Sequence, residues 1–214
     1  MNFKLTKETI EVADQTLYRI EATKNIPSQG VKKGDKGGFV SSIRLSDRTP
    51  RISDNAWVSG NAWVFGNACV SDSASVYGNA SVYGNACVSG DASVYGNASV
   101  YGNASVSGDT LVYGNACVSG DACVSGDASV YGNAKVSDNA IVDSLDSIIS
   151  FTIASKYNVT VTRKHITIGY KTFKRSEAIK MTKEQAKDLG LDEKHYRAYK
   201  LMIKGARLLV KTKA

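Results

Sequence analysis

Two histidines and four cysteines are the side chains of this 214-residue chain that are best suited to acid–base, nucleophilic or metal chemistry. His165 and His195 both stand in the last third of the chain. Neither has a cysteine or carboxylate at a spacing typical of a catalytic pair, so we expect surface or packing roles. The cysteines are Cys69, Cys87, Cys117 and Cys123. They form no C-x-x-C pair and have no histidine nearby, which argues against a zinc site and a redox pair. The sequence therefore predicts reduced thiols, no metal and no cofactor.

The cysteines belong to a hexapeptide repeat that sets the architecture of the chain. Fifteen consecutive units of the form N-A-x-V-x-G run from residue 55 to residue 144, and a weaker unit precedes them at 49–54. The alanine and the valine stand two positions apart, so both point to one side of a short strand and form the core. Glycine followed by Asn or Asp suits a tight bend, because glycine adopts positive φ without steric cost.

The outward positions of the repeat agree every eighteen residues, which predicts that three strands and three bends close one coil. One column is Tyr77, Tyr95, Tyr113 and Tyr131; another is Cys69, Cys87, Ser105 and Cys123, beside serines. A corner column reads Asn61, Asn79, Asn97, Asn115 and Asn133, and stacked asparagines can hydrogen-bond and fix the register. We expect the four tyrosines, with Cys69, Cys87 and Cys123, to form interfaces. For the tyrosines, stacking that only stabilises neighbouring coils is an equal alternative.

The unit V-x-G-[ND]-A-x resembles the hexapeptide repeat of left-handed parallel β-helices, in which an aliphatic residue is followed four positions later by a small one. This resemblance covers residues 55–144 and implies a parallel left-handed β-helix of about five 18-residue coils. Right-handed polymers of the bactofilin type use similar V-x-G-[DN] units. The left hand therefore follows from the resemblance and from the regular period. The predicted fold class is an all-β rod with small α/β caps and a C-terminal domain of strands and two helices.

The first 48 residues predict an α/β cap on the rod, whose open ends would otherwise expose unpaired strand edges. Residues 17–22 read as a strand, and Gly34, Gly37 and Gly38 read as tight turns. Trp57, Trp63 and Phe65 project from the first coil, and we expect the cap to cover them.

The segment L-Y-R-I, followed by V-K-K-G-D-K-G-G-F-V and then the hexapeptide array, resembles a family of phage and prophage hexapeptide-repeat proteins. Its members are often labelled putative transferases from their fold alone. The resemblance covers most of residues 10–145 and implies a viral accessory protein made in the cytoplasm of the infected host cell, with no established activity. The start of the chain has no apolar signal segment and no run is long enough to span a membrane, which agrees with a cytoplasmic protein.

Charge divides the chain into three parts that match the predicted domains 1–48, 49–146 and 147–214. Residues 1–54 hold ten Lys/Arg and seven Asp/Glu, residues 55–144 one Lys and seven Asp, and residues 145–214 sixteen Lys/Arg and six Asp/Glu. The C-terminal part, with a net charge of +10, contains two predicted strands, at 157–162 and 165–170, and two predicted helices.

The last predicted helix, from Asp192 to about Val210, is amphipathic. Its basic face carries Arg197, Lys200, Lys204, Arg207 and Lys211, and Lys171, Lys174 and Arg175 stand nearby in the sequence. The opposite face, which includes Met202, is expected to dock on the domain. The basic residues are candidates for contacts to a nucleic-acid backbone, with a solvated surface as the alternative.

The resemblance to phage proteins, together with the basic C-terminal part, implies a non-enzymatic, phage-encoded protein that binds a host protein or nucleoprotein complex and inhibits a host defence. We expect a homotrimer or a homodimer and no membrane partner. A structural or polymer-forming protein is the alternative. An acyltransferase is the second alternative, because many β-helix enzymes transfer acyl groups. Those enzymes place a histidine on the helix or on an inserted loop, and the array from 55 to 144 has neither.

Overall fold

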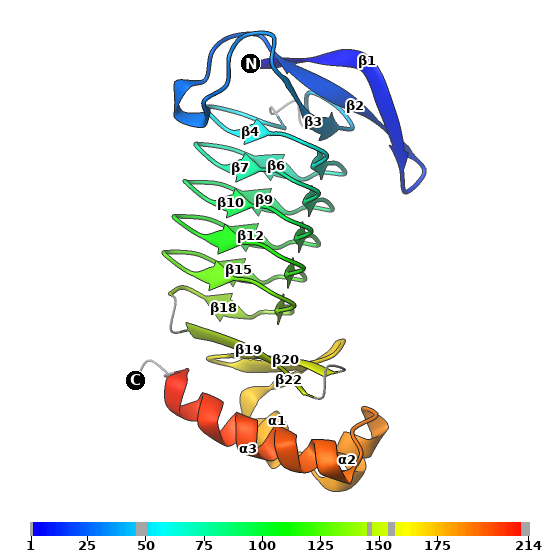
Figure 1. The fold of residues 1–214 in the computed structure, drawn as a ribbon, viewed down its shortest axis with the longest axis vertical. Helices are drawn as coiled ribbons and strands as arrows, with labels where there is room; N and C mark the ends of the chain where they lie inside the picture. Colours follow the sequence, from blue (N-terminus) through cyan, green and yellow to red (C-terminus); the bar gives the residue numbers. More distant parts are fainter. Residues whose placement is uncertain (1, 46–50, 145–146, 154–156, 211–214) are drawn as a thin grey trace.

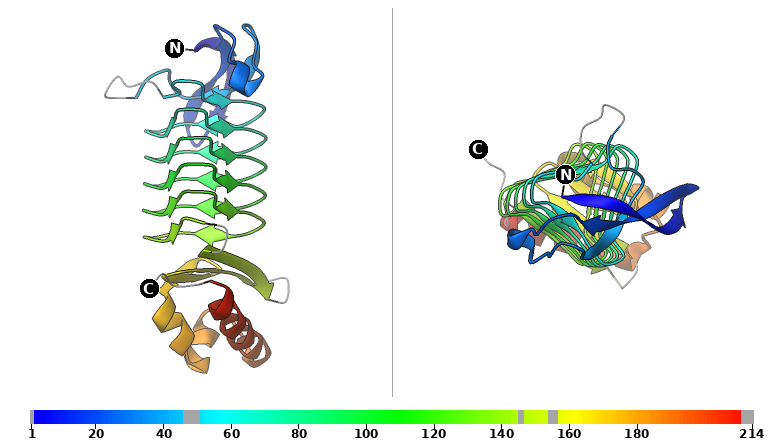
Figure 2. Two further views of the ribbon diagram at one scale, coloured as in Figure 1. Left: turned by 90° about the vertical axis from the view of Figure 1, so that its left-hand side faces the viewer. Right: turned by 90° about the horizontal axis from the view of Figure 1, so that it is seen from above.

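A computed structural model describes residues 2–45, 51–144, 147–153 and 157–210. The chain forms a straight rod with a β-structured cap at its N-terminal end and a mixed domain at its C-terminal end (Figure 1). The side view on the left of Figure 2 shows that the coils of the rod are regular and evenly stacked.

The rod is the parallel left-handed β-helix that the repeat predicts. Each hexapeptide supplies one two-residue strand, and each strand pairs in parallel with the strand eighteen residues later. The first sheet contains β4 (Trp57–Val58), β7 (Ser75–Val76), β10 (Ser93–Val94), β13 (Leu111–Val112) and β16 (Ser129–Val130). The second contains β5 (Trp63–Val64), β8 (Ser81–Val82), β11 (Ser99–Val100), β14 (Cys117–Val118) and β17 (Lys135–Val136). The third contains β6 (Cys69–Val70), β9 (Cys87–Val88), β12 (Ser105–Val106), β15 (Cys123–Val124) and β18 (Ile141–Val142).

Alanine and valine fill the inside of the rod, as the spacing predicts. From Ala56 to Val142 the residues at these two positions are almost completely buried. Thr110 takes one alanine position and is also buried. Its hydroxyl group is satisfied there, since it donates to the carbonyl of Ser107 at 2.6 Å. Alanine alternates with valine along the core, and its small side chain allows three short strands to close around a narrow interior.

Glycine and asparagine make the corners. The corner glycines have φ between 64° and 75°, and a Cβ on most of them would lie about 3 Å from the backbone of the next coil. The predicted asparagine column is hydrogen-bonded from Asn61 to Asn133 at 3.2–3.4 Å. A second column joins Asn67, Asn85, Asn103 and Asp121 at 2.8–3.3 Å. These two columns tie each coil to the next and oppose a slip of register.

The N-terminal cap consists of strands β1 (Phe3–Val12), β2 (Gln15–Ala22) and β3 (Lys36–Val40), with a short 3-10 helix η1 at Pro27–Gln29. The expected α/β character is therefore wrong for the described part of the cap: antiparallel pairing of β1 with β2 and of β2 with β3 satisfies its backbone. The strand predicted at 17–22 is confirmed within β2. Because β3 pairs in parallel with β5, the cap continues the second sheet of the rod and lies across its end (Figure 2).

Gly37 and Gly38 lie in β3, so the prediction that they form tight turns is wrong. A Cβ on Gly37 would stand 2.5 Å from the carbonyl oxygen of Val58, and one on Gly38 would stand 2.4 Å from that of Ala62. The glycines are needed because the cap strand lies directly on the backbone of the first coil. Gly34, with φ of 94°, is the turn residue.

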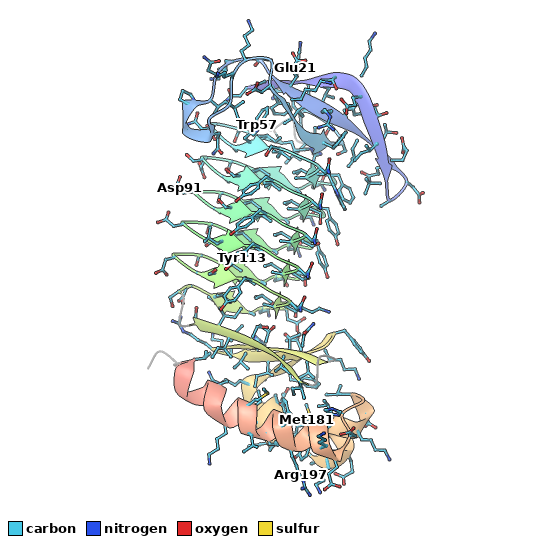
Figure 3. The ribbon with its side chains drawn as sticks, viewed as in Figure 1. Glu21, Trp57, Asp91, Tyr113, Met181 and Arg197 are labelled. Atoms are coloured by element: carbon cyan, nitrogen blue, oxygen red, sulfur yellow. The ribbon has the colours of Figure 1, made fainter. Side chains whose placement is uncertain are left out.

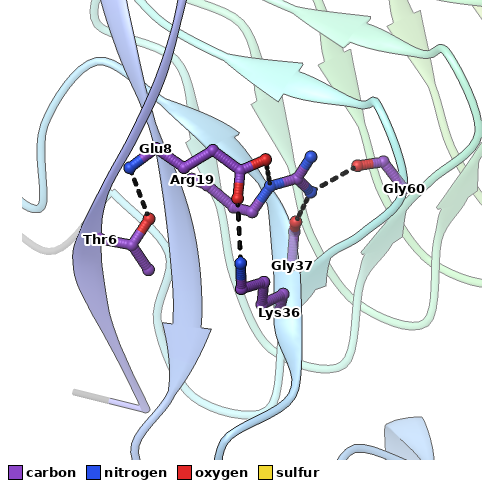
Figure 4. Close-up of polar contacts among 6 residues, drawn as sticks. All are labelled: Thr6, Glu8, Arg19, Lys36, Gly37 and Gly60. Carbon is purple, nitrogen blue, oxygen red and sulfur yellow. Dashed lines mark hydrogen bonds and ion pairs between the residues drawn. The ribbon is translucent and has the colours of Figure 1, made fainter.

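Polar contacts hold the three cap strands together, and Arg19 also reaches the first coil, where it donates to the carbonyl of Gly60 at 3.4 Å. Arg19 donates to Glu8 at 2.6 Å and to the carbonyl of Gly37 at 2.7 Å, and Lys36 pairs with the same carboxylate at 3.1 Å (Figure 4). The hydrogen bond from Arg19, and then that from Lys36, lowers the pKa of Glu8. Arg51 is buried beneath the cap and donates to the carbonyls of Ala68, Gly66 and Ser42 at 2.8–3.1 Å.

The cap covers the aromatic side chains of the first coil, as predicted. Trp57 and Phe65 are buried, and Trp63 is half-buried. Phe65 packs with Leu17 and Phe39 of the cap. The cap therefore buries apolar surface as well as strand edges.

The C-terminal domain stacks an antiparallel sheet on the last coil and places helices on the far side of that sheet (Figure 1). Its strands, in sheet order, are β19 (Ile148–Ile153), β20 (Tyr157–Thr162), β21 (His165–Ile168) and β22 (Lys171–Lys174). Its helices are α1 (Arg175–Lys180), α2 (Lys183–Asp188) and α3 (Glu193–Leu209). The predicted strands β20 and β21 and the predicted helices α2 and α3 are present. The expectation of two helices is wrong, because α1 follows β22 directly.

Local signals in α2 and α3 are confirmed. Thr182 and Gln185 form the predicted capping box, and Asp192 caps α3 by accepting from the backbone of His195 at 2.9 Å. Tyr199 is fully buried and donates to the carbonyl of Ala178 at 2.9 Å. Met202 is 40% exposed, so its predicted place on the docked face is wrong; the apolar face of α3 is narrower than the wheel suggests.

Polar contacts join this domain to the rod. The backbone of Lys135 donates to the hydroxyl of Thr160 at 2.8 Å, and the hydroxyls of Ser137 and Thr172 lie 2.5 Å apart. An ion pair joins Arg163 to Asp143. The C-terminal end of the rod is thus covered by a folded domain.

Candidate binding surfaces

The four predicted interface tyrosines form a continuous stack on the first sheet. Ring centroids are 4.8 Å apart for Tyr77 and Tyr95, 5.0 Å for Tyr95 and Tyr113, and 5.5 Å for Tyr113 and Tyr131. Figure 3 shows Tyr113 on the outside of the rod. Tyr77 and Tyr131, at the two ends of the stack, are exposed, and the middle rings are half-buried. Stacked rings at this spacing stabilise neighbouring coils, so this tyrosine column contributes to the rod's stability.

A second aromatic column runs along the second sheet. Trp63 and Phe65 are followed by Tyr83 and Tyr101, with Phe65–Tyr83 at 5.2 Å and Tyr83–Tyr101 at 4.9 Å. The hydroxyl of Tyr101 lies 3.5 Å from the thiol of Cys117. This hydrogen bond, followed by burial, raises the pKa of Tyr101. The cap covers the start of this column, so less of it is available to a partner than of the tyrosine column.

The cysteines predicted as interface residues are half-buried on the third sheet. Cys69 and Cys87 pair in register, and their sulfur atoms are 2.7 Å apart. Cys123 lies two coils beyond Cys87, opposite Ser105. The sulfurs of Cys69 and Cys87 therefore contact each other along the rod, and Ser105 separates them from Cys123.

The predicted basic residues of α3 have different surroundings. Arg197 is exposed on the side of α3 away from the rod and pairs with Glu193 at 3.0 Å (Figure 3). Lys200 is half-buried and donates to the carbonyl of Ile179 at 2.6 Å. Lys204 is exposed. Arg207 lies in α3, but its side chain is outside the described part of the chain, as is Lys211.

The structure separates the three basic residues predicted near β22. Lys171 is exposed, with its ammonium 5.7 Å from the ring centre of Tyr170. Lys174 and Arg175 instead line a concave site of about 570 Å³. The other polar residues of this site are Arg163, Lys164, His165 and Ser176, and Ile179 and Val210 supply its apolar wall. We call it the cation pocket. Sequence reasoning missed it because its residues come from two separate turns.

Pairing of β21 with β22 builds the cation pocket. His165 lies opposite Lys174 in this antiparallel pair, and the backbone of Arg175 donates to the carbonyl of Lys164 at 2.6 Å. Arg175 also donates from its side chain to the carbonyls of Arg163 at 3.3 Å and Val210 at 3.0 Å. The pocket is therefore held by both the sheet and the end of α3.

The two histidines lie in different surroundings. The Nδ1 atom of His165 is buried and has no hydrogen-bond partner among the described residues. His195 stands at the start of α3, where its Nδ1 is 2.8 Å from a carboxylate oxygen of Asp192. The expectation that no carboxylate accompanies either histidine is thus wrong for His195, because the helix cap brings Asp192 beside it.

Comparison with known proteins gives no family for this chain. No family model matches the sequence, and no curated protein matches it. Within the described ranges, no group of three or more His, Cys, Asp or Glu side chains could hold a metal ion. None of the helices in the described part of the chain combines the length and apolar character that crossing a membrane requires.

Proposed function

We propose that this chain is a non-enzymatic, phage-encoded binding protein that acts in the cytoplasm of the infected host cell. Its rod is a rigid scaffold, and its basic C-terminal domain engages the nucleic-acid backbone of a host nucleoprotein complex. Inhibition of a host defence complex is the use that we propose for this binding. The tyrosine column is the surface through which copies of the chain associate as a dimer or a trimer.

The observation that carries this proposal is the concentration of positive charge at one end of the rod. Residues 145–214 hold sixteen Lys/Arg against six Asp/Glu, whereas residues 55–144 hold one Lys against seven Asp. Exposed lysines occur on several elements of the domain, among them Lys164, Lys174, Lys194 and Lys204. A basic surface of this kind attracts phosphates without reading the base sequence.

Two alternatives have less support. Polymerisation by end-to-end stacking needs free coil ends, but β3 pairs with the first coil and the last coil carries the sheet of the C-terminal domain. Acyl transfer on a β-helix needs a base beside the coils. His165 and His195, the two histidines of the sequence, lie in β21 and α3.

Capture from host cytoplasm by the immobilised full chain tests the proposal. The test variant carries Lys194→Glu and Lys204→Glu in α3. Its matched control carries Lys24→Glu and Lys33→Glu, two exposed lysines of the cap, and so has the same net charge. We expect the wild type and the control to retain a nucleoprotein complex and the test variant to lose it. Equal retention by both variants would contradict the role of the C-terminal domain.

A further inference from the structure

We propose that the cation pocket binds a phosphate group, carried by a nucleotide or by the end of an oligonucleotide. This inference deepens the proposed function and rests on it for the source of the ligand. Binding of phosphate itself depends only on the geometry of the pocket. The two ideas can therefore fail separately.

Two turns bring the cations of the pocket together. Arg163 and Lys164 come from the turn between β20 and β21, and Lys174 and Arg175 come from the junction of β22 and α1. The β21–β22 pairing and the contacts of Arg175 with the carbonyls of Arg163 and Val210 fix these turns against each other. Because the two turns are already fixed, their backbone loses little freedom when a ligand binds.

The balance of charge in the pocket favours an anion. None of the described residues that line it is acidic. Arg163 pairs with Asp143 of the last coil, while Lys164 and Lys174 are exposed at the pocket's edge. An anion in this site would meet Lys164 from one turn, Lys174 from the other, and Ser176.

His165 supplies the second, independent observation. A buried imidazole nitrogen without a hydrogen-bond partner costs free energy, and here this nitrogen belongs to a residue that lines the cation pocket. This nitrogen has almost no exposed surface, so the imidazole must turn toward the pocket before Nδ1–H can donate to a ligand oxygen and remove that cost. A neutral imidazole in the appropriate tautomer and an imidazolium can both make this donation.

Phosphate suits this donor set better than a carboxylate does. It offers more acceptor oxygens, pointing in several directions, and can carry two negative charges. The volume of about 570 Å³ is that of a site for a small ligand of nucleotide size. No Phe, Tyr or Trp side chain lines the described pocket, so recognition would fall mainly on the phosphate.

Titration of the imidazole nitrogens by NMR tests the proposal, because the sequence has two histidines and only His165 lines the pocket. Inorganic phosphate is added to the full chain at constant pH and constant ionic strength. We expect a saturable shift of the His165 signals and no saturable shift for His195. No shift at His165, or the same shift at both, overturns the proposal.

Charge variants give a second readout, by calorimetric titration with the same phosphate probe. Lys164→Gln combined with Lys174→Gln should weaken binding by about tenfold or more, because both remove ammonium groups from the pocket. The control combines Lys180→Gln with Lys187→Gln, two exposed lysines outside the pocket, and should bind as the wild type does. Equal loss in both variants would mean diffuse attraction by the domain and would overturn the site.

Oligonucleotides separate the two sources of phosphate. A short single strand with a 5′-phosphate should bind more tightly than the same strand without it, and the pocket variant should lose this difference. If a mononucleotide binds and neither strand does, the pocket stands as a small-molecule site and the proposed nucleoprotein partner fails.

Discussion

Replacement of two corner glycines in one column measures how tightly the coils stack. Gly114 and Gly132 have φ of 74° and 64°, so alanine is disfavoured at both by the same left-handed backbone. A Cβ on Gly114 would lie 3.0 Å from the backbone nitrogen and 3.2 Å from the backbone oxygen of Gly132. A Cβ on Gly132 would have no atom within 4 Å, because no further coil continues this column.

The expected free energies follow from these contacts. The left-handed conformation costs alanine about 1–2 kcal/mol, and the lower entropy of the unfolded alanine chain offsets about 0.4–1 kcal/mol of that cost. Gly132→Ala should therefore destabilise by about 1 kcal/mol. Gly114→Ala should lose roughly 1–3 kcal/mol more, because the next coil must move.

Urea unfolding, followed by far-UV circular dichroism, gives the free energy of unfolding of each variant. Gly205→Ala in α3 is the control: its φ is ordinary and an added Cβ meets nothing within 4 Å, so it should stabilise by about 0.5–1 kcal/mol. If Gly132→Ala costs as much as Gly114→Ala, backbone strain alone explains the corner glycines and the reasoning from coil stacking is refuted.

Three further predictions concern the cap and the tyrosine column. Glu8→Gln should lower the melting temperature at pH 7. The difference from wild type should fade as the pH falls below 4.5 and through the lowered folded-state pKa of Glu8, because a carboxyl group with a lowered pKa stabilises the fold only while it is ionised. A constant difference in melting temperature down to pH 2 would contradict this. Arg51→Ala should destabilise by about 3 kcal/mol in urea, since it leaves buried carbonyls without donors; a loss below about 0.5 kcal/mol would mean that water replaces the guanidinium. Tyr113→Ala removes two stacked pairs and Tyr131→Ala one, so the first should cost about 0.5–1.5 kcal/mol more; equal losses would show that stacking contributes little.

The rod could be predicted from the sequence because every position of the repeat recurs with the same period and therefore indicates the same coil. Val76 pairs with Val94, and Asn79 with Asn97, because residues eighteen positions apart occupy the same place in neighbouring coils. The outward columns, including the tyrosine column, follow from that period alone. The helix caps at Thr182 and Asp192 could also be predicted, since each depends on residues three positions apart.

Features that depend on contacts between distant segments could not be predicted in the same way. Gly37 and Gly38 resemble turn residues, and only the approach of β3 to the first coil explains them. Arginine is usually exposed, but Arg51 is buried, where it donates hydrogen bonds to backbone carbonyls of two other segments. The cation pocket could not be predicted because the pairing of β21 with β22 brings its residues together. Helical spacing instead indicated Lys200 as a binding residue, but Lys200 donates to a carbonyl within the domain.

The salt dependence of binding to a single-stranded oligonucleotide tests the proposed function most directly. Three lysine–phosphate contacts would give a slope of about −2 for log K against log salt, so affinity should fall roughly 20-fold between 50 and 200 mM salt. Lys194→Glu combined with Lys204→Glu should weaken binding and make the slope shallower, whereas the cap control, Lys24→Glu with Lys33→Glu, should keep the slope of the wild type. An affinity that does not change between 50 and 200 mM salt would contradict phosphate contact by the C-terminal domain, and a slope that survives the reversal of charge in α3 would contradict contact by that helix.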